Sequence, residues 1–587
     1  MEDAAAALGC ATTRLDERLL ASVGVVKEAP LEFVAAGDVP GGGVLCALSA
    51  LLLEGLLRHS RVHFALPAGF YPLETIFLVL AFMALARLRS VEALRYEPPG
   101  EWGKLIGLDR IPEVRTLRAK LALLCAEPAP AAAWSAALAH DWMRAAAPDS
   151  AGVFCVDGHV RVYHGALTQL PRRYVTRERL CLHGTTDYWT NALDGRPFFV
   201  VSRAVDPGLL TVLREDIVPR LLADATASIS PAPAATRALA APATGPCATG
   251  AVPPRLTLIF DREGYSPAFF ADMKDLNIAI LCHHKFPGAD WPREEFAPHT
   301  LTLVHGEEVT MELAERGTCL SNGLWVREVR RRGADGTQVS ILSTDYHTPA
   351  LGPVAVRVCA RWCQENFFKY MREHFALDRL VEHGVAPLPE TTTVVNPAWR
   401  RLDQAVRRET ALVHRRQAEF AARTLSPAPE PPEVEQWQRQ QGELTSALAA
   451  RQAALQELKA QRKATPRHVE LQALPAHEQF ARLRPTRKHF VDTIKLAAYR
   501  AETAMAHVVR EVLARTDDAR AFLRGVYRTT AELLPDAENK TLTVRLHPLA
   551  THAHNTALRH LCAELTATET VFPGTKLQLV YEIAGSA

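Results

Sequence analysis

Three acidic residues at distant positions could together perform metal-dependent chemistry on phosphodiesters. Asp157 follows the apolar run 153–156, and Asp261 follows the apolar run 256–260, so each is predicted to lie at a strand end. Glu365 lies in segment 361–372, whose pattern predicts a helix. Carboxylate oxygens are the ligands that Mg²⁺ prefers, and a pair of such ions can cut and join phosphodiesters. Each acid taken singly is more often a turn, cap or surface residue, so the hypothesis depends on the combination.

The spacing of the three acids indicates a site assembled by the fold and not by one local loop. Both gaps are 104 residues long (261 − 157 and 365 − 261). If the two apolar runs are neighbouring strands of one α/β sheet, Asp157 and Asp261 meet at the same edge of that sheet.

The predicted helix around Glu365 carries a cationic face. Arg361, Lys369 and Arg372 lie four residues before, four after and seven after Glu365, so they share its side of a helix. This pattern is that of a surface salt-bridge ladder, or of a metal ligand flanked by cations that hold DNA phosphates. Further candidates for DNA binding, all between Asp261 and Glu365, are Lys285, Arg327, Arg330 and Arg331.

The composition is that of a folded protein of several domains. The 587 residues are 48% hydrophobic and 22% charged with a net charge of +2, so DNA binding would need local basic patches. The 11 cysteines form no Cys-x2-Cys pair, which favours a reducing compartment and disfavours a zinc site. The apolar stretch 75–86 is too short to span a bilayer, so we expect a buried helix and no membrane.

The chain divides into segments of different texture. We expect a loose lead-in at 1–30 and a helical N-terminal domain for DNA-end binding or dimerisation at 31–148. An α/β core should occupy 149–222 and 255–385, with a β-rich insertion at about 290–335. The Ala/Pro-rich segment 223–254 cannot bury a core and is predicted to be a disordered insertion. A helical region with a helical hairpin or short coiled coil is expected at 386–535, and a small βαβ tail at 536–587.

At these residues the sequence resembles the DDE transposases of bacterial insertion sequences. The signature Tyr-x2-Arg-x3-Glu-x6-Lys of that group is matched by Val358, Arg361, Glu365 and Arg372, with Val in place of Tyr and Arg in place of Lys. Segments 260–266 and 157–160 are similar to those around the family's two aspartates, and the resemblance runs unevenly from about residue 40 to the C-terminus.

The resemblance implies a fold, a reaction and partners. The fold would be an α/β RNase H-like catalytic core with an inserted β-rich segment, flanked by mainly α-helical N- and C-terminal regions. Asp157, Asp261 and Glu365 would be both catalytic residues and ligands of two Mg²⁺ ions, with Mn²⁺ as a substitute. The substrate would be double-stranded DNA, as terminal inverted repeats and target DNA. A homodimer would synapse two ends in the bacterial cytoplasm, associated with the nucleoid.

Two other functions stay open on the sequence alone. One is a catalytically silent, transposase-derived DNA-binding protein, and the other is an RNase H-like nuclease that only hydrolyses. Metal-dependent cleavage separates the first from a transposase, and strand transfer separates the second.

Overall fold

The computed structural model falls into two compact units, which are described separately below. Unit 1 comprises Met1–Val162, Thr186–Gly384 and Arg484–Ala587, and unit 2 comprises Tyr163–Thr185 and Val385–Leu483. The structure describes residues 13–146, 151–165, 170–175, 178–203, 205–228, 253–304, 306–347, 350–379, 381, 384–388, 392–422, 430–476 and 478–585.

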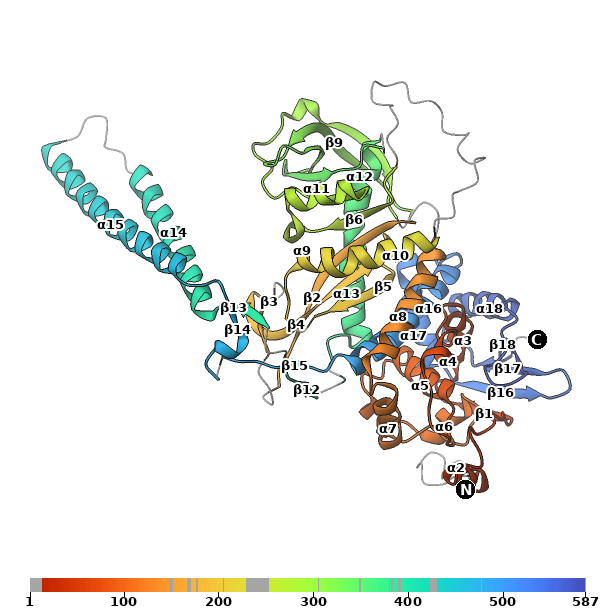
Figure 1. Ribbon diagram of the computed structural model, residues 1–587. Helices are drawn as coiled ribbons and strands as arrows, with labels where there is room; N and C mark the ends of the chain where they lie inside the picture. Colours follow the sequence, from red (N-terminus) through yellow and green to blue (C-terminus); the bar gives the residue numbers. More distant parts are fainter. Residues whose placement is uncertain are drawn as a thin grey trace. The chain divides into compact units, whose positions relative to one another are not determined.

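A large mixed sheet forms the centre of unit 1 (Figure 1). Among the described residues of unit 1 it has nine strands, in the order β4-β2-β6-β7-β11-β10-β9-β8, with β5 paired to β4. The strands of its first half are β2 (Val153–Val162), β4 (Leu180–Asn191), β5 (Pro197–Ser202), β6 (Leu256–Phe260) and β7 (Ile278–His283). Strand β3 (Arg172–Val175) and the first residues of β4 belong to unit 2. Strands β2, β6 and β7 are parallel neighbours, and β6 is buried along its whole length. The runs 153–156 and 256–260 are therefore adjacent strands of one sheet, which is the condition that the sequence leaves open.

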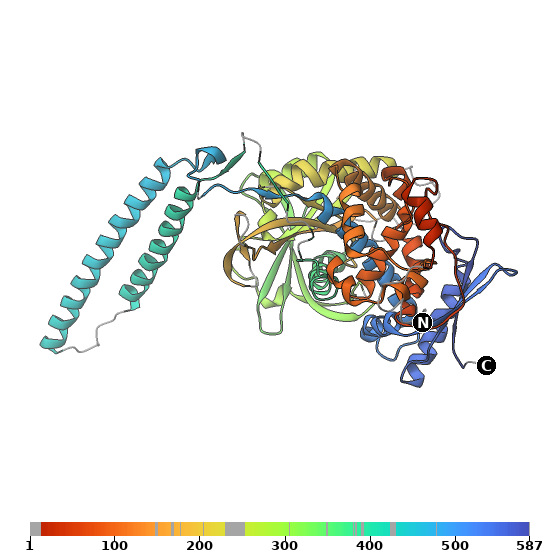
Figure 2. The ribbon, with the colours of Figure 1, turned by 90° about the horizontal axis from the view of Figure 1, so that it is seen from below.

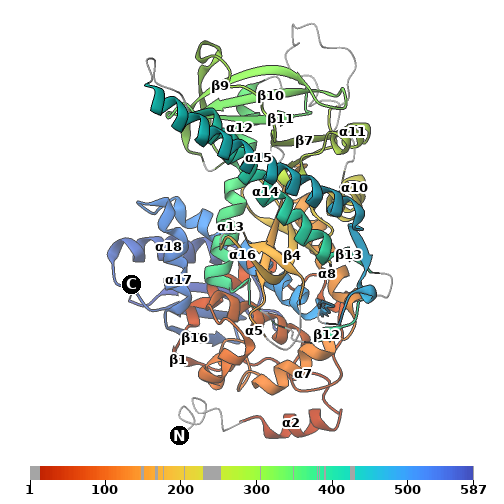
Figure 3. The same ribbon diagram turned by 90° about the vertical axis from the view of Figure 1, so that its left-hand side faces the viewer.

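The β-rich segment extends the main sheet. It consists of β8 (Ala297–Thr302), β9 (Glu308–Cys319), β10 (Trp325–Arg332) and β11 (Gln338–Ser343). These strands pair antiparallel in sequence order, and β11 pairs antiparallel with β7. The inserted strands are therefore continuous with the core sheet through β11. Helices α12 (Leu351–Cys359) and α13 (Arg361–Phe375) follow them. Helix α12 lies against the inserted strands (Figure 3), and α13 lies against β2.

Helices from both ends of the chain share one core in unit 1. The N-terminal elements are α2 (Leu15–Ser22), η1 (Gly42–Cys46), α3 (Ala47–Leu53), α4 (Ser60–His63), α5 (Leu73–Leu85), η2 (Val91–Tyr96), α6 (Pro99–Lys104), α7 (Val114–Leu124) and α8 (Pro128–Arg144). Helix α16 (Thr486–Arg510) packs against α3, α5 and α8, and α17 (Ala519–Arg528) packs against α16 (Figure 2). Phe64, Phe77, Trp134 and Phe490 form one aromatic cluster across these helices. The predicted N-terminal helical domain is thus one layer of a larger body.

A second sheet in unit 1 joins the two ends of the chain. Its order is β1-β16-β17-β18, with β1 (Ala36–Val39), β16 (Ala531–Asp536), β17 (Thr541–Leu546) and β18 (Gln578–Ile583). Strands β17 and β18 are parallel and are connected through α18 (His552–Ala567), which is the predicted βαβ unit. The C-terminal strands of the sheet begin at Ala531, five residues before the predicted start of the tail at residue 536. The sheet also includes β1, which lies in the segment 31–148 that was expected to be helical.

Two other predicted boundaries also shift. The predicted loose lead-in contains α2, whose Arg18 pairs with Asp109 at 2.5 Å. The helical segment formed by α9 (Leu209–Val212), η3 (Leu213–Ile217) and α10 (Val218–Ser228) continues past residue 223, where the Ala/Pro-rich insertion was expected to begin. Residues 229–252 of that predicted insertion lie outside the described residues.

Unit 2 contains the predicted helical hairpin. Helices α14 (Pro397–Ala422) and α15 (Pro431–Ala464) lie side by side (Figures 1 and 3). Val406 and Val413 pack with Leu455 in their shared core, and Arg451 pairs with Glu409 at 2.7 Å across the pair. Two short strand pairs, β12 (Val385–Ala386) with β15 (Arg482–Leu483) and β13 (Thr393–Val395) with β14 (His468–Glu470), flank the hairpin in sequence.

Helix α5, which contains most of the apolar stretch 75–86, is buried in unit 1 as expected. No single helix in the described ranges is long and apolar enough to cross a membrane, although the bent pair α7 and α8 passes by length and composition.

Candidate active site at the sheet edge

The register of the central sheet places Asp157 beside Asp261. Val153 pairs with Thr257 and Cys155 pairs with Ile259, an offset of 104 residues (257 − 153). The same offset separates the two aspartates, so continuing the parallel register brings Asp157 and Asp261 to the same level. The prediction that Asp157 lies at a strand end is wrong, because β2 continues to Val162. Strand β6, in contrast, ends at Phe260. Asp157 therefore lies where its neighbouring strand ends.

Asp261 is held by the first turn that follows β6. Its Oδ1 accepts a hydrogen bond of 2.9 Å from the backbone N–H of Glu263 and so caps the short helix η5 (Arg262–Gly264). This capping explains why an acid follows the strand, and it leaves the other carboxylate oxygen outside that bond.

Helix α13 is fixed to the sheet by the residue directly before Glu365. Gln364 is buried, and its Nε2 donates to the carbonyls of Cys155 and Trp189 at 3.3 and 3.1 Å and to Asn191 Oδ1 at 3.0 Å. These contacts tie α13 to β2 and β4, and Cys155 is only two residues before Asp157. Glu365 is therefore brought to the side of Asp157 by its neighbour in sequence.

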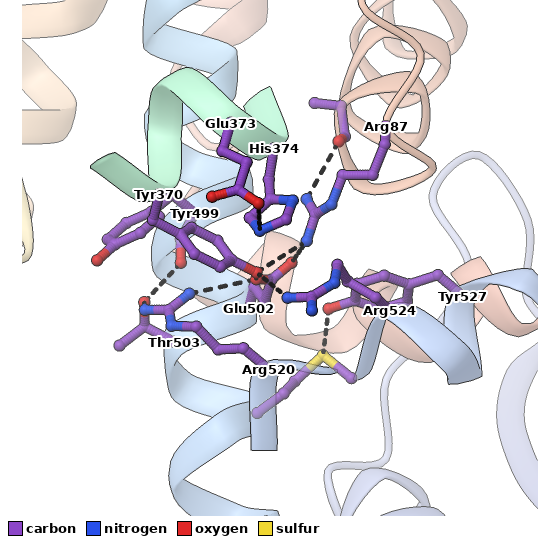
Figure 4. Close-up of polar contacts among 12 residues, drawn as sticks. Arg87, Tyr370, Glu373, His374, Tyr499, Glu502, Thr503, Arg520, Arg524 and Tyr527 are labelled. Atoms are coloured by element: carbon purple, nitrogen blue, oxygen red, sulfur yellow. Dashed lines mark hydrogen bonds and ion pairs between the residues drawn. The ribbon is translucent and has the colours of Figure 1, made fainter. Parts of the chain in front are cut away.

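A polar cluster holds the C-terminal half of the same helix (Figure 4). Glu502 of α16 is fully buried and accepts hydrogen bonds from Arg87 at 2.5 Å, from Arg520 at 3.2 Å and from the Tyr370 hydroxyl of α13. Burial and the Glu502 carboxylate raise the pKa of Tyr370 to about 12, so this hydroxyl stays a donor. The helix that carries Glu365 is thus anchored at two points along its length, Gln364 and Tyr370.

One guanidinium joins the acids of the two elements. A single nitrogen of Arg361, Nη2, lies 3.7 Å from Asp157 Oδ2 and 3.8 Å from Glu365 Oε1. The Asp157 side chain is 23% exposed, whereas that of Glu365 is 58% exposed. Arg361 therefore acts as the counter-cation of the acids in this conformation.

The acids interact electrostatically as one group. Burial raises the pKa of Asp157 to about 6; Arg361 opposes this, and the charges of Asp261 and Glu365 add to it. The three predicted acids thus lie within electrostatic reach of one another, and their surplus negative charge is only partly compensated.

A fourth acid, Glu263, belongs to the same cluster and was missed by the sequence reasoning. Burial raises its pKa to about 7, and the charges of Asp261, Asp206 and Asp157 contribute. The available signal was an acid two residues after Asp261, within the segment already recognised. His283, at the end of β7, lies near the same charged groups. Burial lowers its pKa to about 4, and the charges of Arg361 and Arg262 add to this lowering.

The donor set fits a divalent cation by its chemistry. Carboxylates lie within electrostatic reach of one another at a sheet edge. Burial raises the pKa of Asp157 and of Glu263, and the charges of the neighbouring acids add to this, so a bound cation would relieve the cost of ionising them. The side chains are not arranged as a finished ligand set: in the described part of the chain, no three His, Cys, Asp or Glu residues are grouped to hold a metal ion. The Arg361 guanidinium lies close to both Asp157 and Glu365 and balances part of their negative charge.

The predicted DNA-binding residues separate into two groups. Lys285 and Lys369 are exposed, and Arg361, Arg372 and Arg331 are partly exposed. Arg327 and Arg330 are buried within the inserted strands, where Arg327 pairs with Glu315 and Arg330 pairs with Glu328 at 2.8 Å. Arg330 also lies 4.3 Å from the ring centroid of buried Trp291. We therefore leave Arg327 and Arg330 out of the proposed DNA-binding set, because their charges are already committed inside the protein.

The departure from the family signature at Val358 has a structural reason. Val358 is buried in a small apolar cluster with Val354, Ile259 and Leu281. A residue at this position packs α12 onto the sheet, so Val358 contributes apolar contacts and no hydroxyl.

The fold and site together define a mixed α/β protein with a carboxylate cluster at the edge of its central sheet. A family model described as "Transposase protein" matches residues 7–585, so the chain belongs to this transposase family. Among solved structures, a cryo-EM structure of the piggyBac transposase synaptic complex with hairpin DNA is similar to it. The identity is 10%, the match covers 82% of this chain and 85% of that chain, and the TM-score is 0.26. No curated protein matches the sequence.

Proposed function

We propose that the chain is a DDE-type DNA transposase, with Asp157, Asp261 and Glu365 as its catalytic acids. The observation that carries the proposal is the shared offset of 104 residues, which brings Asp157 and Asp261 level in neighbouring parallel strands. Membership of a transposase family supplies the reaction class. The central strands β2, β4, β5, β6 and β7 with α13 would be its RNase H-like core.

In this proposal the acids hold two divalent cations, Mg²⁺ or Mn²⁺. Such ions, when bound, activate the attacking water and stabilise the leaving oxygen of the phosphodiester. Arg361 would exchange its contacts with Asp157 and Glu365 for a DNA phosphate, because the cations then neutralise the acids. Lys369 is exposed on the same helix one turn further on, and it would hold the next part of the backbone.

The partners follow from the reaction. Double-stranded DNA would be bound as terminal inverted repeats and then as target DNA, and two copies of the chain would synapse the two ends. An insertion-sequence origin in bacteria belongs to the same proposal. Short inverted repeats flanked by a direct duplication, in the DNA outside the reading frame, would support that origin.

The test is nicking of DNA that carries the ends of the element. Wild-type protein should nick these ends only with Mg²⁺ or Mn²⁺ and should join pre-cut 3′-OH ends to target DNA. Asp157→Ala, Asp261→Ala and Glu365→Gln should each abolish nicking and keep DNA binding. A matched control is Asp275→Asn, an exposed acid at the end of α11 (Pro267–Asp275).

The outcomes separate the alternatives. Full nicking by any of the three variants would refute the assignment of the site. DNA binding without cleavage by the wild type would favour a catalytically silent DNA-binding protein. Cleavage without joining of 3′-OH ends would favour a nuclease that only hydrolyses.

A further inference from the structure

A cavity of about 370 Å³ lies in unit 1 at the opposite end of α13 from Glu365. Its walls come from α5, η2, α7, the segment after α13 and α16. Lys495 of α16 lines it and donates a hydrogen bond of 3.2 Å to the carbonyl of Ala376, the residue that ends α13. Glu365 and Ala376 are 11 residues apart (376 − 365), or about 16 Å along the helix at 1.5 Å per residue. The cavity is therefore separate from the carboxylate cluster.

The polar lining of the cavity is strongly cationic. Five basic side chains from four different segments line it: Arg89, Arg118, Arg379, Arg487 and Lys495. Glu92 is the one acid among the described residues that line it, and it already pairs with Arg118 and, at 3.2 Å, with Arg95. Even without counting Arg487, the described part of the lining has more positive than negative side chains, and a bound anion would neutralise that surplus.

Lys495, a buried cation of the lining, lies among other positive charges. Lys495 is 7% exposed, and burial lowers its pKa to about 7. The positive charges of Lys488 and Arg379 lower this pKa further, whereas the carboxylate of Asp492 raises it. Asp492 is committed to Lys488, with one of its oxygens 2.5 Å from Nζ. Asp492 is thus engaged by Lys488, and Lys495 donates to the Ala376 carbonyl.

The remaining lining is apolar, so the ligand should have an apolar or aromatic part as well as a negative charge. It is formed by Leu80, Met83, Leu88, Leu121, Val491 and Ile494, among others. A cavity near 370 Å³ is in the range of small-molecule sites, which commonly combine an apolar wall with a few convergent polar groups. Guanidinium groups bind phosphates through paired hydrogen bonds, and several of them suit an anion with more than one negative charge.

We propose that this cavity binds an organic phosphate of nucleotide size. The phosphate would contact the Arg379, Arg487 and Lys495 side of the cavity, and the base or sugar would lie on the apolar wall. The phosphate could belong to a free nucleotide or to a nucleotide of bound DNA, which is the same chemistry from two sources. The proposal is independent of the catalytic assignment, because none of the lining residues belongs to the carboxylate cluster.

The test is isothermal titration of the full chain in EDTA, so that the carboxylate cluster holds no cation to which a phosphate could bind. The probes are deoxyadenosine 5′-monophosphate, deoxyadenosine and inorganic pyrophosphate. The monophosphate should bind at least tenfold more tightly than deoxyadenosine, and pyrophosphate should compete with it. Arg379→Gln and Arg487→Gln should each weaken the monophosphate at least tenfold.

The controls separate a binding defect from a folding defect. Arg379 is exposed, so Arg379→Gln should keep the melting temperature of the wild type even if Arg487→Gln lowers it. Arg115→Gln is the matched control, since Arg115 is exposed on α7, outside the cavity lining, three residues before Arg118. A short DNA duplex that displaces the monophosphate assigns the phosphate to DNA, and one that does not assigns it to a free nucleotide. Failure of both phosphate probes to bind, or wild-type affinity in Arg379→Gln, would overturn the proposal.

Discussion

The ionised, partly buried Asp157 should destabilise the metal-free protein, so Asp157→Asn should stabilise it at neutral and alkaline pH. The pKa of Asp157 is raised from 3.8 to about 6. A difference of 2.2 pKa units at 1.36 kcal/mol each makes the ionised carboxylate cost about 3 kcal/mol in the folded state above pH 6. Because the folded state binds the proton more tightly, the cost grows as pH rises between the two pKa values and is absent below 3.8. Asparagine can keep the hydrogen bond from Gly158 N–H, which is 2.8 Å long, without the charge.

The assay is urea denaturation of wild type and variant in EDTA, followed by tryptophan fluorescence. The variant should gain about 3 kcal/mol at about pH 8 and only about 1.5 kcal/mol at about pH 5, where the wild-type carboxyl is mostly protonated when folded. Asp275→Asn, the exposed control, should gain nothing at either pH. A variant that is less stable than wild type at about pH 8, or one whose gain is equal at both pH values, would refute the electrostatic account of the site.

Four further variants test the packing and the charges around the site. Gln364→Leu removes the hydrogen bonds from Nε2 to β2 and β4, so urea denaturation should show a loss of roughly 2 kcal/mol. Gel-shift affinity for DNA should persist in this variant while nicking falls. Lys369→Ala should leave the free energy of unfolding unchanged and reduce the slope of the logarithm of the DNA-binding constant against log salt by about 1. Arg330→Ala should lower the free energy of unfolding by about 3–5 kcal/mol, because it leaves buried Glu328 without the Arg330 charge. Glu502→Gln should also cost about 3–5 kcal/mol by thermal or urea unfolding, because Arg87 and Arg520 lose their buried carboxylate. Unchanged stability in Gln364→Leu or Arg330→Ala would contradict these positioning roles.

The sequence carried enough information to predict the strands and acids of the candidate site. The apolar runs before Asp157 and Asp261 predict buried strands because a strand buried on both faces needs uninterrupted apolar residues. That the two strands are neighbours is a condition that the structure supplies. The helix around Glu365 was evident from its amphipathic spacing, as was the hairpin of α14 and α15. Each of these features is local, so a window of a few residues is enough to indicate it.

Features that depend on contacts between distant segments were not predictable in this way. The pairing of β1 with β16 joins residues that are nearly 500 positions apart, as for Ala36 with Leu533, and nothing local to Ala36 specifies that partner. The burial of Arg330 depends on the Glu328 and Trp291 side chains around it, so its charge alone suggested a surface residue. The role of Gln364 was hidden because a single glutamine between apolar and charged neighbours has no pattern of its own.

The most direct test of the central claim is divalent cation binding by the acids themselves. Titration of the metal-free chain with Mn²⁺, followed by electron paramagnetic resonance, measures bound and free ion without any DNA substrate. We predict that wild type and Asp275→Asn bind Mn²⁺, and that Asp157→Asn and Asp261→Asn each lose this binding. Equal Mn²⁺ binding by all four proteins, or no binding by the wild type, would contradict the proposal that Asp157, Asp261 and Glu365 form the metal site of a transposase.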